Sequence, residues 1–99
     1  MFARHVTVHG SPERIDEGIR VQRENMVPVL RQCQGFIAQV FLVDRATGDV
    51  VGMSLWKSEA DMLASEAKVR PVRQRVAQQV GSSAAPDVRI YEVPVFEIA

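Results

Sequence analysis

The sequence has little cysteine and no excess of charge of either sign. Cys33 is the only cysteine in 99 residues, so no disulfide can form within the chain and nothing indicates an oxidising compartment. Lys and Arg number 12, and Asp and Glu also number 12, so no net positive charge attracts a phosphate backbone or an anionic membrane. We therefore expect a cytoplasmic protein with no nucleic acid and no membrane as partner.

Long hydrophobic runs are also absent. The longest aliphatic and aromatic run is VFLV at residues 40–43, whereas a membrane helix needs about 20 apolar residues. The N-terminal MFARHVTVHG contains no apolar segment of the kind found in secretion signals. Hydrophobic residues still make up 46% of the chain, which predicts one folded domain over residues 1–99.

Strand patterns occur at four places in the chain, which are residues 2–9, 36–44, 49–56 and 88–98. The second of these, FIAQVFLVD, is almost continuously apolar and so predicts a strand that is covered on both faces. The turn RATG joins it to the third strand as a hairpin. Pro94 interrupts the last strand and cannot donate a ladder hydrogen bond, which places it at an edge or a bulge.

The first helix is expected to start at Ser11 as N-cap, with Pro12 in the first turn, and to end near Gly35. Its apolar residues are spaced three or four positions apart as far as Cys33, if Gln22 is counted with them. This spacing predicts one apolar face along the helix. Pro28 removes a backbone hydrogen bond inside this helix, so we predict a bend near residues 25–26.

The second helical region opens at Ser58, followed three residues later by Asp61, in a pattern that resembles a capping box. Because the residue before a proline avoids the helical conformation, Pro71 predicts a break into two segments, residues 58–69 and 71–80.

The resulting order is β-α-β-β-α-β, which is typical of an α+β ferredoxin-like fold with two helices on one face of an antiparallel sheet. The helices can cover one face only, although residues 36–44 require cover on both. We therefore predict a homodimer formed through the open sheet face. The end of the last strand is expected to reach the partner.

The hairpin QGFIAQVFLVDRATGD, the following SLWKSEADM and the proline in each helix together resemble the antibiotic biosynthesis monooxygenase-like family of dimeric α+β barrels. The similarity spans the whole chain. It implies a cavity between helices and sheet that accepts a flat aromatic molecule, with Trp56 in its wall. Some members are monooxygenases that use neither metal nor flavin, and others bind and cleave haem, so the fold does not choose an activity.

The favoured hypothesis is binding of a small hydrophobic or aromatic molecule, with cofactor-independent oxygenation of a phenol or quinol as the enzymatic form. Ser54 shares a strand face with Trp56 and can donate a hydrogen bond, while Arg73 or, preferably, Arg75 would stabilise an oxyanion. His9 is the candidate general base. Gly52 occupies the position of the oxygenases' asparagine, and Met62 and Phe36 are the side chains expected around it.

The alternative is a non-catalytic ligand-binding or dimerisation module. Haem degradation is not expected, because Arg75, Ser65 and Ala3 stand where the family has its histidine ligand and two accompanying residues. No metal is expected either. His5 and His9 share a strand face but lie roughly 13 Å apart, at about 3.3 Å per residue, which is too far for one ion.

Overall fold

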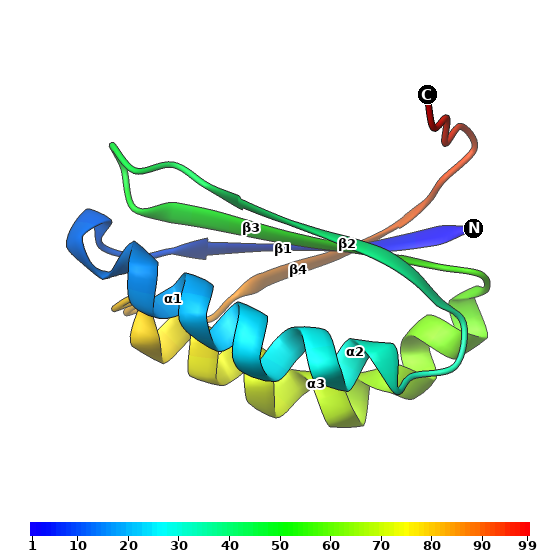
Figure 1. Cartoon of the computed structure of the whole chain (residues 1–99), viewed down its shortest axis with the longest axis horizontal. Helices are drawn as coiled ribbons and strands as arrows, with labels where there is room; N and C mark the ends of the chain where they lie inside the picture. Colours follow the sequence, from blue (N-terminus) through cyan, green and yellow to red (C-terminus); the bar gives the residue numbers. More distant parts are fainter.

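The chain forms one antiparallel sheet with its helices on a single face. The computed structural model describes residues 1–99. Its elements are β1 (Phe2–His9), η1 (Pro12–Arg14), α1 (Ile15–Val21), η2 (Gln22–Met26), α2 (Val27–Arg31), β2 (Phe36–Val43), β3 (Asp49–Trp56), α3 (Glu59–Gln79) and β4 (Asp87–Glu92). The strand order is β2-β3-β1-β4, and the helices lie side by side below the sheet (Figure 1). The predicted α+β ferredoxin-like arrangement is confirmed.

The first helical region runs without interruption from Pro12 to Arg31 but changes its winding part-way. Residues 22–26 form a π-helical turn, which lies immediately before Pro28. Val27 donates its backbone N–H to Gln22 O across this wider turn. The π turn is therefore how the helix adjusts to a proline that cannot donate, at the position where the sequence predicts a bend.

The second helical region is one helix, and the predicted break at Pro71 is wrong. Helix α3 continues through the proline from Glu59 to Gln79. Pro71 removes the N–H that would bond to the carbonyl of Ala67, and both residues are exposed, so water can satisfy that carbonyl. The predicted cap is confirmed, because Ser58 Oγ accepts a hydrogen bond from the backbone N–H of Asp61 at 3.1 Å.

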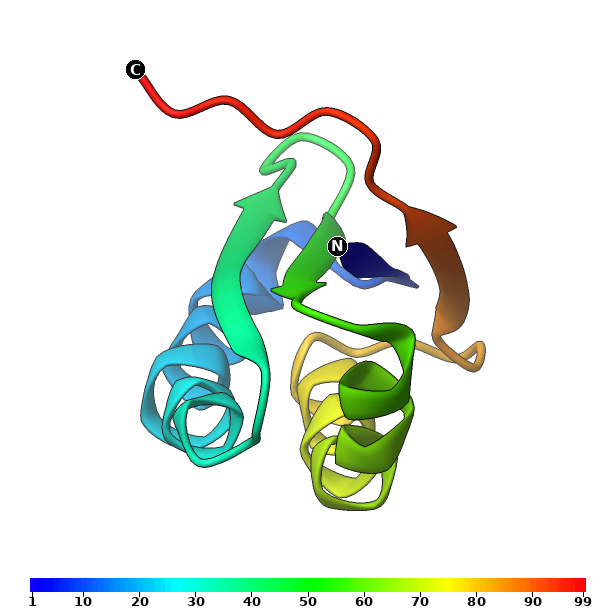
Figure 2. The same ribbon diagram turned by 90° about the vertical axis from the view of Figure 1, so that its right-hand side faces the viewer.

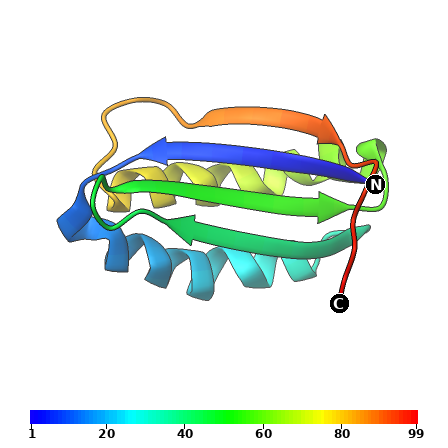
Figure 3. The same ribbon diagram turned by 90° about the horizontal axis from the view of Figure 1, so that it is seen from above.

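The last strand is shorter than predicted, because β4 ends at Glu92 instead of continuing to residue 98. Val93 donates to the backbone carbonyl of Met1, and Pro94 then follows without a donor of its own. Residues 93–99 leave the sheet and cross its open face near the N-terminal end of β1 (Figure 2 and Figure 3).

Two clusters of buried side chains lie between the helices and the sheet. The first contains Val8, Ile15, Val50, Ala77 and Val80. The second lies at the other end and contains Met26, Leu30, Trp56, Met62 and Val69. Polar side chains are buried in the same layer, and they define the candidate site.

Candidate functional site

A cavity of about 40 Å³ lies between the helices and the sheet. Its apolar wall comes from valine, leucine, methionine and phenylalanine side chains of β1, β2, β3, α2, α3 and η2. Its polar lining is Arg4, Gln22, Gln39, Ser54 and Arg73. Such a mixture of an apolar wall with a few converging polar groups is typical of a small-molecule site.

The pleat of the sheet brings the strand residues of this lining together. Arg4 of β1 is the register partner of Ser54 of β3, which in turn pairs with Gln39 of β2, so all three side chains point to the helix face. Gly52 lies two residues before Ser54 in β3, so its Cα faces the same side of the sheet. A Cβ at Gly52 would lie 3.8 Å from Phe41 Cδ1 and 4.0 Å from Gln39 Nε2, so space is open above it.

Helix α3 and strand β1 contribute a partly buried ion-pair network beside the cavity. Arg73 donates from Nη1 and Nη2 to the two carboxylate oxygens of Glu66, at 2.8 and 2.7 Å. Arg4 donates from Nη1 to Glu66 Oε1 at 3.2 Å and from Nη2 to Ser65 Oγ at 3.0 Å. Arg4 is 4% exposed and Arg73 is 7% exposed, so both cations lie in the protein interior.

These contacts fix the charge state of the network. The hydrogen bonds from Arg73 lower the pKa of Glu66 to about 2, with a further lowering by the charge of Arg4, so Glu66 is ionised at neutral pH. Burial lowers the pKa of Arg4, and the neighbouring charge of Arg73 lowers it further. Because an arginine side chain remains protonated in proteins, one carboxylate faces two buried cations.

Arg73 also carries an unsatisfied donor. Its Nε is buried and has no hydrogen-bond partner, and no other buried side-chain nitrogen or oxygen lacks one. Buried polar groups in folded proteins are almost always paired, so an unpaired one calls for a specific explanation.

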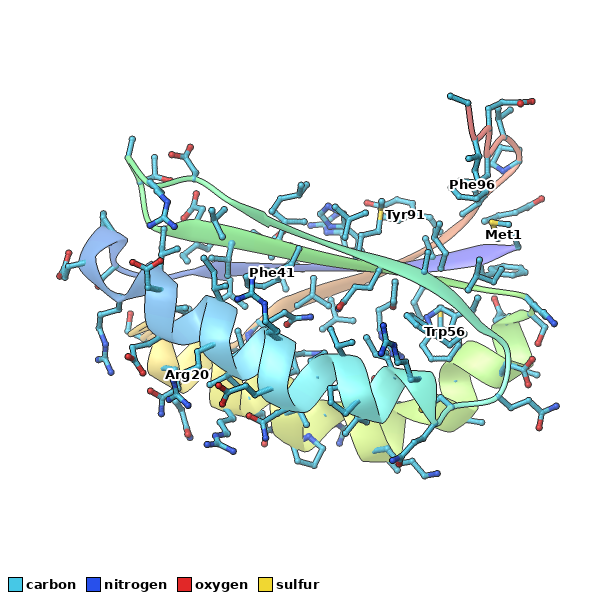
Figure 4. The ribbon with its side chains drawn as sticks, in the orientation of Figure 1. Met1, Arg20, Phe41, Trp56, Tyr91 and Phe96 are labelled. Atoms are coloured by element: carbon cyan, nitrogen blue, oxygen red, sulfur yellow. The ribbon has the colours of Figure 1, made fainter.

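Trp56 lies in the core and does not line the cavity. Its side chain is fully buried, and its indole Nε1 donates to Ser54 Oγ at 2.8 Å. Figure 4 shows Trp56 between the sheet and the helices. Its ring packs edge-on against Phe36, with the ring centroids 5.5 Å apart, and the guanidinium carbon of Arg4 lies 5.4 Å from the ring centroid. Trp56 therefore acts on the cavity through residues that line it, such as Ser54 and Arg4.

His9 and Arg75 are not brought to Ser54. His9 lies at the end of β1, on the face away from the helices, and its Nδ1 is 2.8 Å from Asp49 Oδ1. Arg75 is exposed on α3, whereas Arg73, two residues earlier, lines the cavity. Of the two arginines considered from the sequence, the structure thus brings Arg73 to the site.

Met62 and Phe36 do not fill the space above Gly52. Met62 is fully buried in the cluster around Trp56, and Phe36 packs against the same cluster. Neither side chain lines the cavity, while Gly52 and Ser54 do. Open space is therefore present at Gly52, but its volume of about 40 Å³ is far less than the several hundred Å³ of a typical ligand site.

A second hollow of about 300 Å³ lies outside the first, between the helical region and the edge strand β2. Gln22, Gln39 and Phe41 line both hollows and therefore separate them. Gln22 Nε2 donates to Gln39 Oε1 at 2.6 Å across this partition.

No three His, Cys, Asp or Glu side chains gather closely enough to hold a metal ion. His5 and His9 lie on the same face of β1, and His5 instead contacts Tyr91 of β4 edge-on, with ring centroids 6.2 Å apart. No helix of the chain is both long enough and apolar enough to cross a membrane.

Solved structures with this fold include a monooxygenase from Streptomyces coelicolor, the product of ActVA-Orf6, in complex with nanaomycin D. It has a TM-score of 0.81 and 15% identity, and the match covers 99% of this chain and 91% of that one. This chain has the antibiotic biosynthesis monooxygenase fold. An antibiotic biosynthesis monooxygenase at 21% identity has a TM-score of 0.70, with 94% and 98% of the two chains covered.

At the level of sequence, no family profile matches the chain. It is 35% identical over 93 residues to the uncharacterised Mycobacterium tuberculosis protein Rv2557, covering 94% of this chain and 41% of that protein. Rv2558 of the same species is 33% identical over 84 residues, covering 85% and 36%. The chain thus spans about two fifths of the curated relatives that it matches.

The polar residues that sequence reasoning missed share one signal. Gln39 is the single polar side chain inside the apolar stretch FIAQVFLV, and Gln22 interrupts the apolar stripe of the first helix. Arg4 stands on the strand face that carries Val6 and Val8. A polar residue at an apolar position of a periodic pattern identifies each of them, because burying it requires a partner or a ligand.

Proposed function

We propose that the protein binds a small aromatic molecule between its helices and its sheet and acts as a cofactor-independent monooxygenase on a phenol or quinol. The observation that carries the proposal is the cavity above Gly52, with apolar walls and donors from Ser54 and Arg73. The Streptomyces coelicolor monooxygenase with the same fold binds nanaomycin D, which supports a small-molecule ligand.

The proposed chemistry makes small demands on the protein. A phenol that loses its proton can transfer an electron to oxygen, provided that the site excludes water and stabilises the phenolic oxygen. The Ser54 hydroxyl accepts from Trp56 and donates to no other group, so its proton is free for that oxygen. Trp56 would hold Ser54 in place, and Arg73 would supply the positive charge.

We further propose that the protein is a cytoplasmic homodimer assembled through the open sheet face. Leu42 is 52% exposed and Val40 42% exposed on that face of β2, and Tyr91 of β4 is 50% exposed on the same face. Val95 and Ile98 of the tail that crosses this face are 75% and 79% exposed. A second copy would cover these apolar side chains. The lone Cys33 is the basis for the cytoplasm.

The test is a titration with naphthohydroquinones and anthrones under anaerobic conditions, followed by calorimetry and thermal shift. Gly52→Leu should abolish binding by filling the cavity, whereas Gly52→Ala should preserve it, because an added Cβ makes only ordinary contacts there. Oxygen uptake with the bound compounds then tests catalysis. If no compound binds wild type, the non-catalytic dimerisation module replaces this proposal.

A further inference from the structure

We propose that the cavity accepts the carboxylate of an aromatic acid, with the Nε–H of Arg73 as its donor. This inference rests on the proposed function, because it names the class of molecule that the same site binds. It is carried by the imbalance of charge, the unpaired donor and the two adjoining hollows.

The charge imbalance comes from α3 and β1 together. Arg4 and Arg73 both line the cavity, at 4% and 7% exposure, and the carboxylate that contacts them is Glu66 alone. Arg70 Nε also lies 3.3 Å from Glu66 Oε2, so the single carboxylate of Glu66 forms ion pairs with three arginines. A buried cation is stable only when it is paired, and an anionic ligand would supply the missing negative charge.

The cavity lining also contains two hydrogen-bond donors without an acceptor. Both terminal nitrogens of Arg73 are occupied by Glu66, which leaves Nε–H as the buried donor without a partner. The hydroxyl of Ser54, which lines the same cavity, has a free proton. A carboxylate has two charged oxygens, so one can accept from each residue, and hydrogen bonds to a charged acceptor are stronger than those to the oxygen of a neutral phenol or amide.

The size of the inner cavity suits such a head group. The volume of the inner cavity, about 40 Å³, is larger than the roughly 10–15 Å³ that one water molecule needs but too small for an aromatic ring system. The outer groove of about 300 Å³, with Ile19, Val27 and Val43 in its wall, suits the flat body. The head would enter where Gln22 and Gln39 meet. Gln22 lies in the π-helical turn, a type of irregularity common at functional sites.

The experiment compares 2-naphthoate with 2-naphthamide by isothermal calorimetry at pH 7 and fixed salt. The two compounds share the same ring system and differ in charge. Wild type is expected to bind naphthoate at least tenfold more tightly, and Arg73→Gln should remove this preference. Arg75→Gln deletes the same charge two residues away at an exposed position and should retain it.

Glu66→Gln provides a second variant should Arg73→Gln fail to fold. It releases Arg73 and Arg4 from their internal carboxylate, so naphthoate affinity should rise several-fold while naphthamide affinity stays unchanged. Equal affinity of wild type for the two compounds would overturn the carboxylate inference and leave the proposed function standing. Binding of neither these two compounds nor any hydroquinone or anthrone would overturn both.

Discussion

At the scale of single residues, Trp56 organises the site without touching its open space. Its indole N–H holds Ser54, its ring packs against Phe36, and the cation of Arg4 lies near its π system. The largest side chain of the sequence thus stands at the strand end because it joins the buried core to the polar lining. Trp56 therefore affects a ligand by holding Ser54 in position.

Replacing Trp56 by Phe separates these roles. The variant loses one buried hydrogen bond and part of a well-packed ring, so we expect a loss of about 1–3 kcal/mol in the free energy of unfolding. Ligand affinity measured by calorimetry should fall by less than about tenfold, because the ring is outside the cavity. Denaturant unfolding gives the free energies of unfolding of Trp56→Phe, Ser54→Ala and the double variant. The part of the change in the double variant that is not the sum of the two single changes measures the indole–hydroxyl hydrogen bond.

Glu66 predicts a specific acid sensitivity. Its pKa falls from an ordinary 4.5 to about 2 in the folded protein, so the folded state binds fewer protons between these values than the unfolded state. The stability that Glu66 contributes is therefore complete above about pH 4.5 and is lost as the pH falls toward 2.

Denaturant unfolding at pH 7 and at pH 3 measures this contribution. Glu66→Gln should lower stability at pH 7 by about 2 kcal/mol and by clearly less at pH 3. Glu59→Gln, which changes the same charge in the first turn of the same helix, controls for the net charge. An equal loss from Glu66→Gln at both pH values would contradict the ion-pair account.

At the scale of elements, the two helical prolines have different consequences. Pro28 follows a π-helical turn that redistributes the backbone hydrogen bonds, whereas Pro71 lies inside a helix that simply continues. The difference matters for the site, because an unbroken α3 keeps Glu66 and Arg73 seven residues apart on one face. A broken helix would not hold that bidentate pair.

Pro71→Ala tests this account of α3. The substitution restores the N–H that bonds to Ala67 and removes a residue unfavourable in a helix, so the free energy of unfolding should rise by about 1–2 kcal/mol. Chemical denaturation followed by circular dichroism measures it. Pro86→Ala, in the loop before β4, has no helical bond to restore and should bring no gain.

The sequence predicts most of these elements because their signals are local. The alternation over residues 49–56 and the cap at Ser58 both appear where they are expected. The continuity of α3 is not predicted, since exposure of the unbonded carbonyl depends on tertiary packing. The site is predicted in part, because Gly52 and Ser54 follow from strand periodicity. The shared pairing of Arg4 and Arg73 with Glu66 joins residues far apart in the chain and needs the fold.

At the scale of the whole molecule, the two faces of the sheet differ in their cover. Helices bury the side chains of β1 and β3 on one face, while Val40 and Leu42 remain exposed on the other. The tail of residues 93–99 crosses this open face at one end only (Figure 3). An apolar sheet face of this kind is typical of an interface.

Leu42→Glu tests the proposed dimer. A carboxylate in an apolar interface would be buried without a partner, so the variant should sediment as a monomer where wild type sediments as a dimer. Leu63→Glu is a matched control, because Leu63 is 53% exposed but lies on α3, on the opposite side of the sheet. A dimer that persists in Leu42→Glu would contradict assembly through this face.

The position of β1 in the middle of the sheet also governs how the molecule is made. Phe2 pairs with Trp56 on one side and with Glu92 on the other, so β1 gains its second neighbour only after β4 has been made. Strand pairings between residues so far apart in the sequence slow folding. The chain must lose conformational entropy to close a long loop before the contacts between the strands can compensate for that loss. Completion of the sheet is therefore a late step in folding.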